Sequence, residues 1–276
     1  MFKKLNIRLI PTTDVSGSAV REKYMRKAIH AGLDRLRLSI VAAIVALPLQ
    51  ADAVSAAQLH VDPILLELDE PAAAGTLALR NSENAEVTVQ TRVFRWVQVD
   101  GKESLEPTSD VVASPPAIKL APGADYIVRV VRVSKQPVSG EESYRVVIDQ
   151  LPNARNQKAK TVNLLIRQSI PVFFRAQRLS SPDVAWTVYH EGNKLMILAT
   201  NQGQERMRIA ALRLRDAAGT TVSFGNGLVG YALGQASMSW EVPAVPRGFG
   251  TGGTVSITAE TNKGPIRATT QVRDRR

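Results

Sequence analysis

Apolar and polar residues alternate in short segments along most of this chain, and a period of two is the pattern of half-buried β-strands. In the segment Ala85–Val99 (AEVTVQTRVFRWVQV), for example, Val87, Val89 and Val93 share one parity. Turn-forming pairs such as Asp100-Gly101 separate these segments. Beyond the first 56 residues, no segment of helical length shows the 3.6-residue period of an amphipathic helix. The pattern therefore predicts an all-β protein.

The predicted strands fall into two tracts of similar length. In the first tract they cover Leu59–Leu68, Thr76–Arg80, Ala85–Val99, Tyr126–Val133, Tyr144–Leu151 and Thr161–Arg175. In the second tract they cover Val184–His190, Lys194–Thr200, Met207–Arg215, Thr221–Phe224, Leu228–Leu233, Gly253–Ala259 and Ile266–Gln271. Many short strands separated by turns are typical of β-sandwiches. We therefore expect two sandwich domains, residues 57–175 and 182–276, joined by a linker at residues 176–181.

The last strand of the first tract, Thr161–Arg175, is unusual in its length and in its apolar face. Most strands run five or six residues, whereas this segment has fifteen. Pro171 cannot donate to a ladder of hydrogen bonds, which favours an edge position or a bulge. Two interpretations remain open: the apolar face packs into its own sandwich, or the strand is an apolar edge that a soluble protein must cover. The residues on that face include Val162, Leu164, Ile166 and Ile170.

The first 56 residues differ from the rest and are typical of a secretory signal peptide. A long basic stretch precedes Leu38–Leu49 (LSIVAAIVALPL), an uncharged apolar run that is too short to span a bilayer comfortably. Small residues after this run allow cleavage after Ala53 or Ala56. Translation from Met25 instead of Met1 would give a leader of ordinary length. The alternative is that the run is a single N-terminal membrane anchor.

The net charge of +10 is a poor guide to the partner of this protein, because half of it lies in the leader. Residues 1–56 hold nine Lys and Arg against four Asp and Glu, a net +5, so the remainder carries about +5. A mildly basic exported protein does not require a nucleic-acid partner. The chain also lacks cysteine, which excludes disulfides, thiol nucleophiles and cysteine-ligated metals.

Residues with catalytic or metal-binding chemistry are sparse. His60 and His190 fall in different tracts, and neither has a second His or paired carboxylates at ligand spacing. The chain has no G-x-S-x-G nucleophile elbow. Its glycine-rich segments, Gly225-Asn226-Gly227 and Gly248–Gly253, do not open a predicted helix as a phosphate-binding loop would. The sequence therefore predicts a protein that is not an enzyme and that binds no metal or cofactor.

Arginines recur on the predicted strands of the first tract, often between apolar neighbours. Most strand arginines face solvent, but one that lies in a cleft between two sandwiches can bind a carboxylate through its guanidinium fork. The arginines concerned are Arg92, Arg95, Arg129, Arg132, Arg145, Arg167 and Arg175.

Several segments of the first tract match one known family in order and spacing. They are QLHVDPILLEL, VTVQTRVFRWVQ followed by Asp100-Gly101, SPPAIKLAPGADYIVRV, and YRVVIDQLP leading into LLIRQSIPVFFR. With these segments and its leader, the chain resembles the periplasmic pilus assembly chaperones of the PapD type. The resemblance covers residues 57–175 and is only loose beyond residue 182. The SPP…APG and SIPVFF forms look most like the branch that serves archaic-type, spore-coat-protein-U-like pili.

The resemblance implies two immunoglobulin-like domains in a boomerang arrangement and a mechanism called donor-strand complementation. A pilin subunit lacks the last strand of its own sandwich, and the chaperone lends it one. Val162, Leu164 and Ile166 fall where the family's donor residues lie, with Ile170 further along the same face. The resemblance implies no ATP or other cofactor, since burial of the subunit's apolar surface drives capture.

The family also holds the C-terminal carboxylate of the subunit with two basic residues in its cleft, and here the sequence departs. The two positions correspond to Leu65 and Pro171, neither of which is basic. If another base serves as the anchor, the candidates are Arg129 or Arg167, and then Arg145.

Arg175 looks like the arginine near the domain junction that the family uses in an interdomain salt bridge. Its acidic partner stays open, because Gln150 stands where an acid is common and Asp149 lies beside it.

By this resemblance, the protein is a periplasmic chaperone of a Gram-negative bacterium. Its partners would be pilin or fimbrial subunits and an outer-membrane usher, with no nucleic acid. When free, it would cover its apolar strand as a homodimer. The alternative is a secreted immunoglobulin-like structural pilus subunit or adhesin. A pilin is normally a single incomplete domain with an N-terminal extension of alternating apolar residues, whereas this chain enters its first strand directly after the leader.

Overall fold

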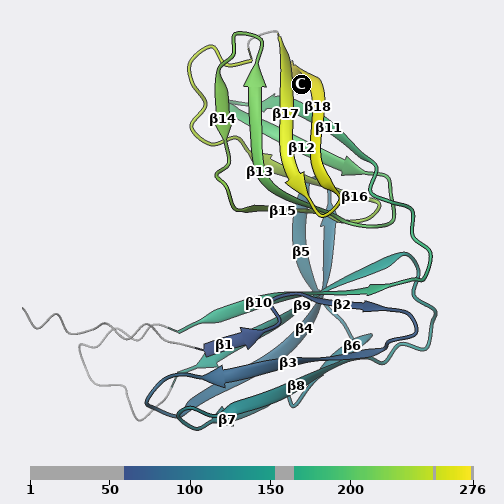
Figure 1. Cartoon of the computed structure of the whole chain (residues 1–276), viewed down its shortest axis with the longest axis vertical. Helices are drawn as coiled ribbons and strands as arrows, with labels where there is room; N and C mark the ends of the chain where they lie inside the picture. The colour runs from purple at the N-terminus through teal and green to yellow at the C-terminus, as the bar shows by residue number, and fades with distance from the viewer. Residues whose placement is uncertain (1–58, 153–164, 251–252, 275–276) are drawn as a thin grey trace, which may run out of the picture. The chain divides into compact units, whose positions relative to one another are not determined.

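The computed structural model describes residues 59–152, 165–250 and 253–274. Within these ranges, all of the regular secondary structure is β-strand (Figure 1). The predicted signal peptide, residues 1–56, lies outside the described residues. Within the described ranges, no helix has the length and apolar character needed to cross a membrane. The predicted all-β class is confirmed.

Strands β1 to β10 form two sheets that face each other across one core. The first sheet holds, in spatial order, β1 (Leu59–Asp62), β3 (Ala74–Asn81), β8 (Asp125–Arg132) and β6 (Val111–Ser114). The second sheet holds β2 (Leu66–Asp69), β10 (Arg167–Arg175), β9 (Glu141–Leu151), β4 (Val87–Val99) and β5 (Lys102–Pro107), and β7 (Ala117–Leu120) pairs with β4. Figure 1 shows β3 and β8 running side by side in the first sheet.

Alternate residues of both sheets fill the core of this first sandwich. Leu77 and Leu79 of β3 are fully buried, as are Val146 and Ile148 of β9. Burial of each such aliphatic side chain stabilises the fold by about 1.5–3 kcal/mol relative to an exposed one. The period of two that predicted these strands is therefore also the pattern that builds the core.

Strands β11 to β18 form one continuous sheet that folds over a second core. Its order is β14 (Thr221–Ser223), β13 (Met207–Asp216), β17 (Thr254–Thr261), β18 (Gly264–Asp274), β11 (Val184–Glu191), β12 (Lys194–Asn201) and β16 (Ala236–Glu241), and β15 (Leu228–Ala232) pairs with β13. Ile197 of β12 and Leu214 of β13 share this core, so the two ends of the sheet face each other. Two separate cores confirm the prediction of two β-sandwiches.

Some strands differ from the prediction. The segment Leu59–Leu68, predicted as one strand, divides near Pro63 into β1 and β2, which belong to different sheets. Proline has no backbone N–H to donate, so a ladder is interrupted there. Strand β5 was not predicted, because all of its residues are exposed and it carries no apolar alternation. Strands β6 and β16 were missed as well.

The hairpin of β4 and β5 makes backbone contact with the second sandwich. Its turn is Asp100-Gly101, with φ angles of 51° and 77°, which suits the right-handed twist of a hairpin. The Gly101 carbonyl oxygen accepts hydrogen bonds from the backbone amide of Ser239, at 2.9 Å, and from its hydroxyl, at 2.8 Å. Because Ser239 lies in β16, the turn joins the two sandwiches directly.

Candidate functional site

The predicted donor strand begins at a free edge of the second sheet. β10 pairs with β9 over its whole length, but with β2 only over Val172–Arg175. Within the described residues, the segment 167–171 therefore has a strand on one side only. The contact with β9 extends one residue further, because the Gln150 amide donates to the Ile166 carbonyl at 2.9 Å. A free edge of this kind can be joined by a strand of another protein.

The predicted donor residues are divided between this protein's own core and its margin. Ile170 is 4% exposed and packs with Val172 inside the first sandwich. Ile166 has the same parity and is half-buried. Val162 and Leu164 lie outside the described residues. Ile170 is therefore part of the protein's own core, whereas Ile166 lies at the margin of that core.

Gln168 interrupts the apolar face of β10 for a structural reason. Its Nε2 donates to the Leu59 carbonyl oxygen of β1 at 2.5 Å. Because β1 belongs to the first sheet, this hydrogen bond joins the two sheets at the end of the sandwich where Ile166 lies.

The three candidate anchors lie in different surroundings. Arg129 is an exposed residue of β8 in the first sheet, whereas Arg145 and Arg167 belong to the second sheet. Arg167 pairs with Asp149, and the same carboxylate binds Arg92 at 2.5 Å. Arg129 is thus apart from the sheet that carries the free edge, and Arg167 already has an acidic partner.

Arg145 has a half-buried guanidinium that pairs with no carboxylate among the described residues. Its Cζ lies 3.7 Å from the centroid of the Trp96 ring, and its Nη1 donates to the Ser169 carbonyl at 3.4 Å. Burial lowers the pKa of Arg145, against an opposing effect of Glu103. Because a buried cation gains from a charge-assisted hydrogen bond, Arg145 is the candidate best prepared to receive a carboxylate.

A buried aromatic cluster lies beneath this candidate anchor, where the two sandwiches meet. It contains Trp96 and Phe173 from the first sandwich and Tyr231 and Leu233 from the second. The Trp96 and Tyr231 rings meet edge to face at 5.4 Å. Gln98 donates to the Tyr231 carbonyl at 2.8 Å and accepts from the Leu233 amide at 2.9 Å. Both sandwiches therefore hold the indole ring in place.

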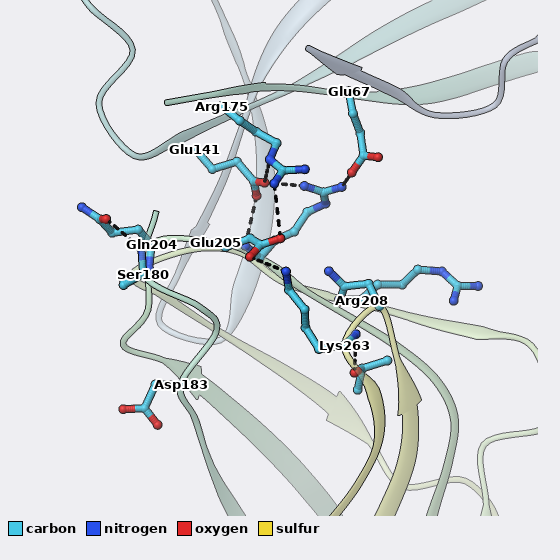
Figure 2. Close-up of polar contacts among 12 residues, drawn as sticks. Glu67, Glu141, Arg175, Ser180, Asp183, Gln204, Glu205, Arg208 and Lys263 are labelled. Carbon is cyan, nitrogen blue, oxygen red and sulfur yellow. Dashed lines mark hydrogen bonds and ion pairs between the residues drawn. The ribbon is translucent and has the colours of Figure 1, made fainter. Parts of the chain in front are cut away.

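Arg175 lies in a network of charged residues between the two sandwiches (Figure 2). Its guanidinium nitrogens are 3.3 Å from Asp69, 4.0 Å from Glu141 and 3.7 Å from Glu205. Glu205 belongs to the second sandwich and is the acidic partner of Arg175 there. Asp149, which the sequence offered as a partner, binds Arg92 and Arg167 instead.

Arg206 is central to this network, although no pattern in the sequence indicated it. Its side chain is 3% exposed, pairs with Glu141 and Glu67, and lies 3.6 Å from the Phe173 ring centroid. Burial raises the pKa of Glu141, and this outweighs the lowering effect of Arg206. An arginine just before a strand is ordinarily exposed, so only the fold reveals that this one is buried.

Metal chemistry finds no support in the part of the chain that the structure describes. Within it, no three His, Cys, Asp or Glu side chains lie together as a metal site requires. The two histidines singled out above, His60 and His190, lie on β1 and β11 of different sandwiches.

Comparison with known proteins finds relatives of the first sandwich. Residues 58–180 match the family of pili and flagellar-assembly chaperones, PapD N-terminal domain. The chaperone protein PapD of Escherichia coli is 27% identical over 95 residues, which are 33% of this chain and 39% of PapD. The matched part thus spans less than half of that relative. The resemblance to PapD-like pilus assembly chaperones, a periplasmic family, is confirmed.

Solved structures of pilus chaperones share the fold of both sandwiches. A chain of the CsuC-CsuE chaperone–tip subunit complex, from the archaic chaperone-usher Csu pili of Acinetobacter baumannii, matches with a TM-score of 0.59 at 21% identity, over 80% of this chain and 100% of that one. A chain of the Salmonella enterica SafA pilin–SafB chaperone complex matches with a TM-score of 0.53 at 19% identity, over 78% and 98%. At these identities, the likeness shows the two-domain immunoglobulin-like fold.

Proposed function

We propose that this protein is a periplasmic chaperone that captures pilus subunits by donating the free edge of β10 and the residues before it. The observation that carries the proposal is the edge at residues 167–171, which has a partner strand on one side only among the described residues. The match of residues 58–180 to the PapD N-terminal domain supports assignment to the chaperone class. The SafA–SafB complex is an example of a chaperone bound to a pilin.

In this mechanism, the donated segment completes the sandwich of the subunit. An extended segment of residues 161–166 reaches about 20 Å, at about 3.3 Å per residue. Its backbone groups pair with the subunit's strands, and Val162, Leu164 and Ile166 occupy apolar pockets at every second residue. These side chains continue the parity of Ile170, so the subunit's core would extend this protein's own core. Burial of apolar surface supplies the driving force without ATP.

Arg145 serves as the carboxylate anchor in this proposal. It lies directly across the ladder from Pro171, one of the two positions that correspond to the family's basic anchor residues. Its charge is desolvated, Glu103 opposes that effect, and no carboxylate among the described residues lies within ion-pair distance. A subunit's terminal carboxylate would supply that neutralising partner.

Export, delivery and self-capping also belong to the proposal. The leader directs the chain to the periplasm and is cleaved, and the loaded chaperone delivers its subunit to an outer-membrane usher. In the absence of a subunit, a second copy of the chain covers the apolar edge. Binding alone performs this task, so no enzymatic step is included.

The experiment that tests the proposal is co-expression with the pilus subunit encoded in the same gene cluster. Wild-type protein should keep the subunit soluble and form a complex of one copy each. Leu164→Asp and Ile166→Asp should abolish that complex, because a charged side chain cannot enter an apolar pocket without a partner. Leu165→Asp is the matched control, because Leu165 has the opposite parity and is 47% exposed.

Thermal unfolding of each variant alone shows whether the fold is preserved. Ile166 lies outside the buried core cluster, so its substitution should leave the unfolding midpoint close to that of wild type. Soluble subunit in equal yield with all three variants would refute strand donation.

A further inference from the structure

A shallow hollow on the outer face of the second sandwich gathers three arginines. It lies over β13, β17 and β18 and has a volume of about 480 Å³. Its polar lining includes Arg213, Arg215, Arg267, Ser256, Thr258 and Thr269. These six residues are exposed, while the residues between them on β13 and β17, Leu214 and Ile257, are fully buried. The hollow is therefore on the side of the sheet that faces away from the core.

The strand register places the arginines close together. Arg213 lies opposite Thr258, which in turn lies opposite Arg267. Arg213 and Arg267 are thus two strands apart, about 10 Å between backbones. Arg215 is two residues along β13 from Arg213, about 7 Å away. Three guanidinium groups on flexible stems can therefore reach one region of the hollow.

No carboxylate among the described residues lies within ion-pair distance of these three arginines. In the first sandwich, by contrast, arginines such as Arg80 and Arg132 pair with acids. Arg213 donates to the Asn226 side-chain oxygen at 2.8 Å, which orients its guanidinium without neutralising it. The hollow therefore carries a concentrated positive charge.

We propose that this hollow binds the phosphate groups of an anionic membrane surface. Arginine forks match phosphate oxygens, and neighbouring Ser256, Thr258 and Thr269 offer hydroxyl donors to the same oxygens. Membrane phosphates lie in a plane, so several of them can meet the three arginines at once.

A protein partner fits this face less well. Protein interfaces centre on buried aromatic or other large apolar anchors. The apolar residues that line the hollow are Ile257, which is fully buried, and Ala268, which is small. Charge complementarity with an anionic surface is therefore the recognition that this face offers, and it does not involve the predicted donor strand.

The test measures binding of the purified chain to vesicles. The probes are phosphatidylcholine vesicles and vesicles with 30% phosphatidylglycerol, at low and at high salt. The triple variant Arg213→Gln, Arg215→Gln, Arg267→Gln removes the cluster. A control variant, Lys119→Gln, Arg178→Gln, Arg247→Gln, removes the same charge from exposed positions outside the hollow. Circular dichroism and thermal unfolding compare the folds of all three proteins.

Wild type should bind the anionic vesicles in a salt-sensitive way and the neutral ones weakly. At roughly a fivefold gain for each arginine near an anionic surface, the hollow variant should lose on the order of 100-fold in affinity, and the control variant much less. Equal loss in both variants would mean that net charge alone drives binding and would overturn the proposal. Absence of vesicle binding, or equal binding of wild type to neutral and anionic vesicles, would also overturn it.

Discussion

The guanidinium of Arg145 lies 3.7 Å from the centroid of the Trp96 ring, on the outer face of the sheet whose β10 edge is free. Ring and cation attract each other by about 0.5–2 kcal/mol, and more when the pair is desolvated. Its Nη1 donates to the Ser169 carbonyl at 3.4 Å, and no carboxylate among the described residues lies within ion-pair distance of the guanidinium. Arg145 is thus held in one place with donors available for a carboxylate.

Arg145→Ala should weaken the complex with a pilus subunit about 10- to 100-fold, because a charge-assisted hydrogen bond contributes about 1.5–3 kcal/mol. Arg145→Lys should recover part of this affinity, since an ammonium keeps the charge but not the bidentate fork. The measurement is titration of the purified chain with a subunit held in a soluble, strand-accepting form.

Arg129→Ala is the control for this prediction, because Arg129 is exposed on the other sheet. If Arg145→Ala binds as tightly as wild type while Ile166→Asp does not, Arg145 is not the anchor but strand donation stands.

Asp149→Asn should destabilise the first sandwich by about 1–2 kcal/mol at pH 7, because Asp149 binds both Arg92 and Arg167. Burial acts to raise the pKa of Asp149, but hydrogen bonds from Arg167 and Arg92 lower it overall. A lowered folded pKa gives stability that is complete above the unfolded value of about 3.9 and is lost as the pH falls through the folded pKa. The difference between wild type and variant should therefore begin to shrink below about pH 4 and disappear only once the pH is below the folded pKa of Asp149.

Urea unfolding at several pH values measures this difference. Asp125→Asn is the comparison, since Asp125 forms an exposed pair with Arg80 and should have little effect at any pH. A deficit of Asp149→Asn that persists unchanged at pH 3 would show that the charge of Asp149 is not its cause.

The fold could be predicted from the sequence wherever a strand has one buried face. The bounds of four strands, β3, β8, β9 and β12, were predicted to within a few residues. In these strands apolar residues alternate with polar ones, and the apolar residues are those that enter a core. β5 has no buried residue, so its sequence lacks this alternation and the strand could not be predicted.

The site was harder to predict, because it depends on contacts between the two sandwiches. Arg175 was found from its resemblance to a family position, but its partner Glu205 follows from packing that local sequence does not encode. The same holds for Arg206, which is buried only because the second sandwich meets Phe173. For the anchor, the sequence ranked Arg145 last, whereas its burial and its Trp96 contact favour it.

Gly101→Ala should destabilise the protein by more than the usual cost of about 1 kcal/mol for an L-residue at positive φ. Gly101 has φ of 77°, and a Cβ there would lie 2.7 Å from the Ser239 hydroxyl oxygen. Gly123 has a similar φ of 71°, but a Cβ there would meet nothing within 4 Å. Gly123→Ala is therefore a matched control for backbone strain alone. Equal losses in urea unfolding would mean that the added Cβ is accommodated beside Ser239 without further cost.

Arg206→Met should cost about 3–5 kcal/mol in unfolding free energy, because it leaves the Glu141 carboxylate, whose side chain is 0% exposed, without its closest partner. Methionine retains much of the packing over Phe173, so the loss reports mainly on the charge. Adding Glu141→Gln should recover a large part of the lost unfolding free energy, since both members of the buried ion pair are then neutral.

Guanidinium-induced unfolding of the two single variants and the double variant gives the coupling energy. Lys194→Met and Glu241→Gln form the comparison cycle, because that pair is exposed and should show no measurable coupling. A double variant no more stable than Arg206→Met would show that packing at the junction, and not the buried ion pair, joins the two sandwiches.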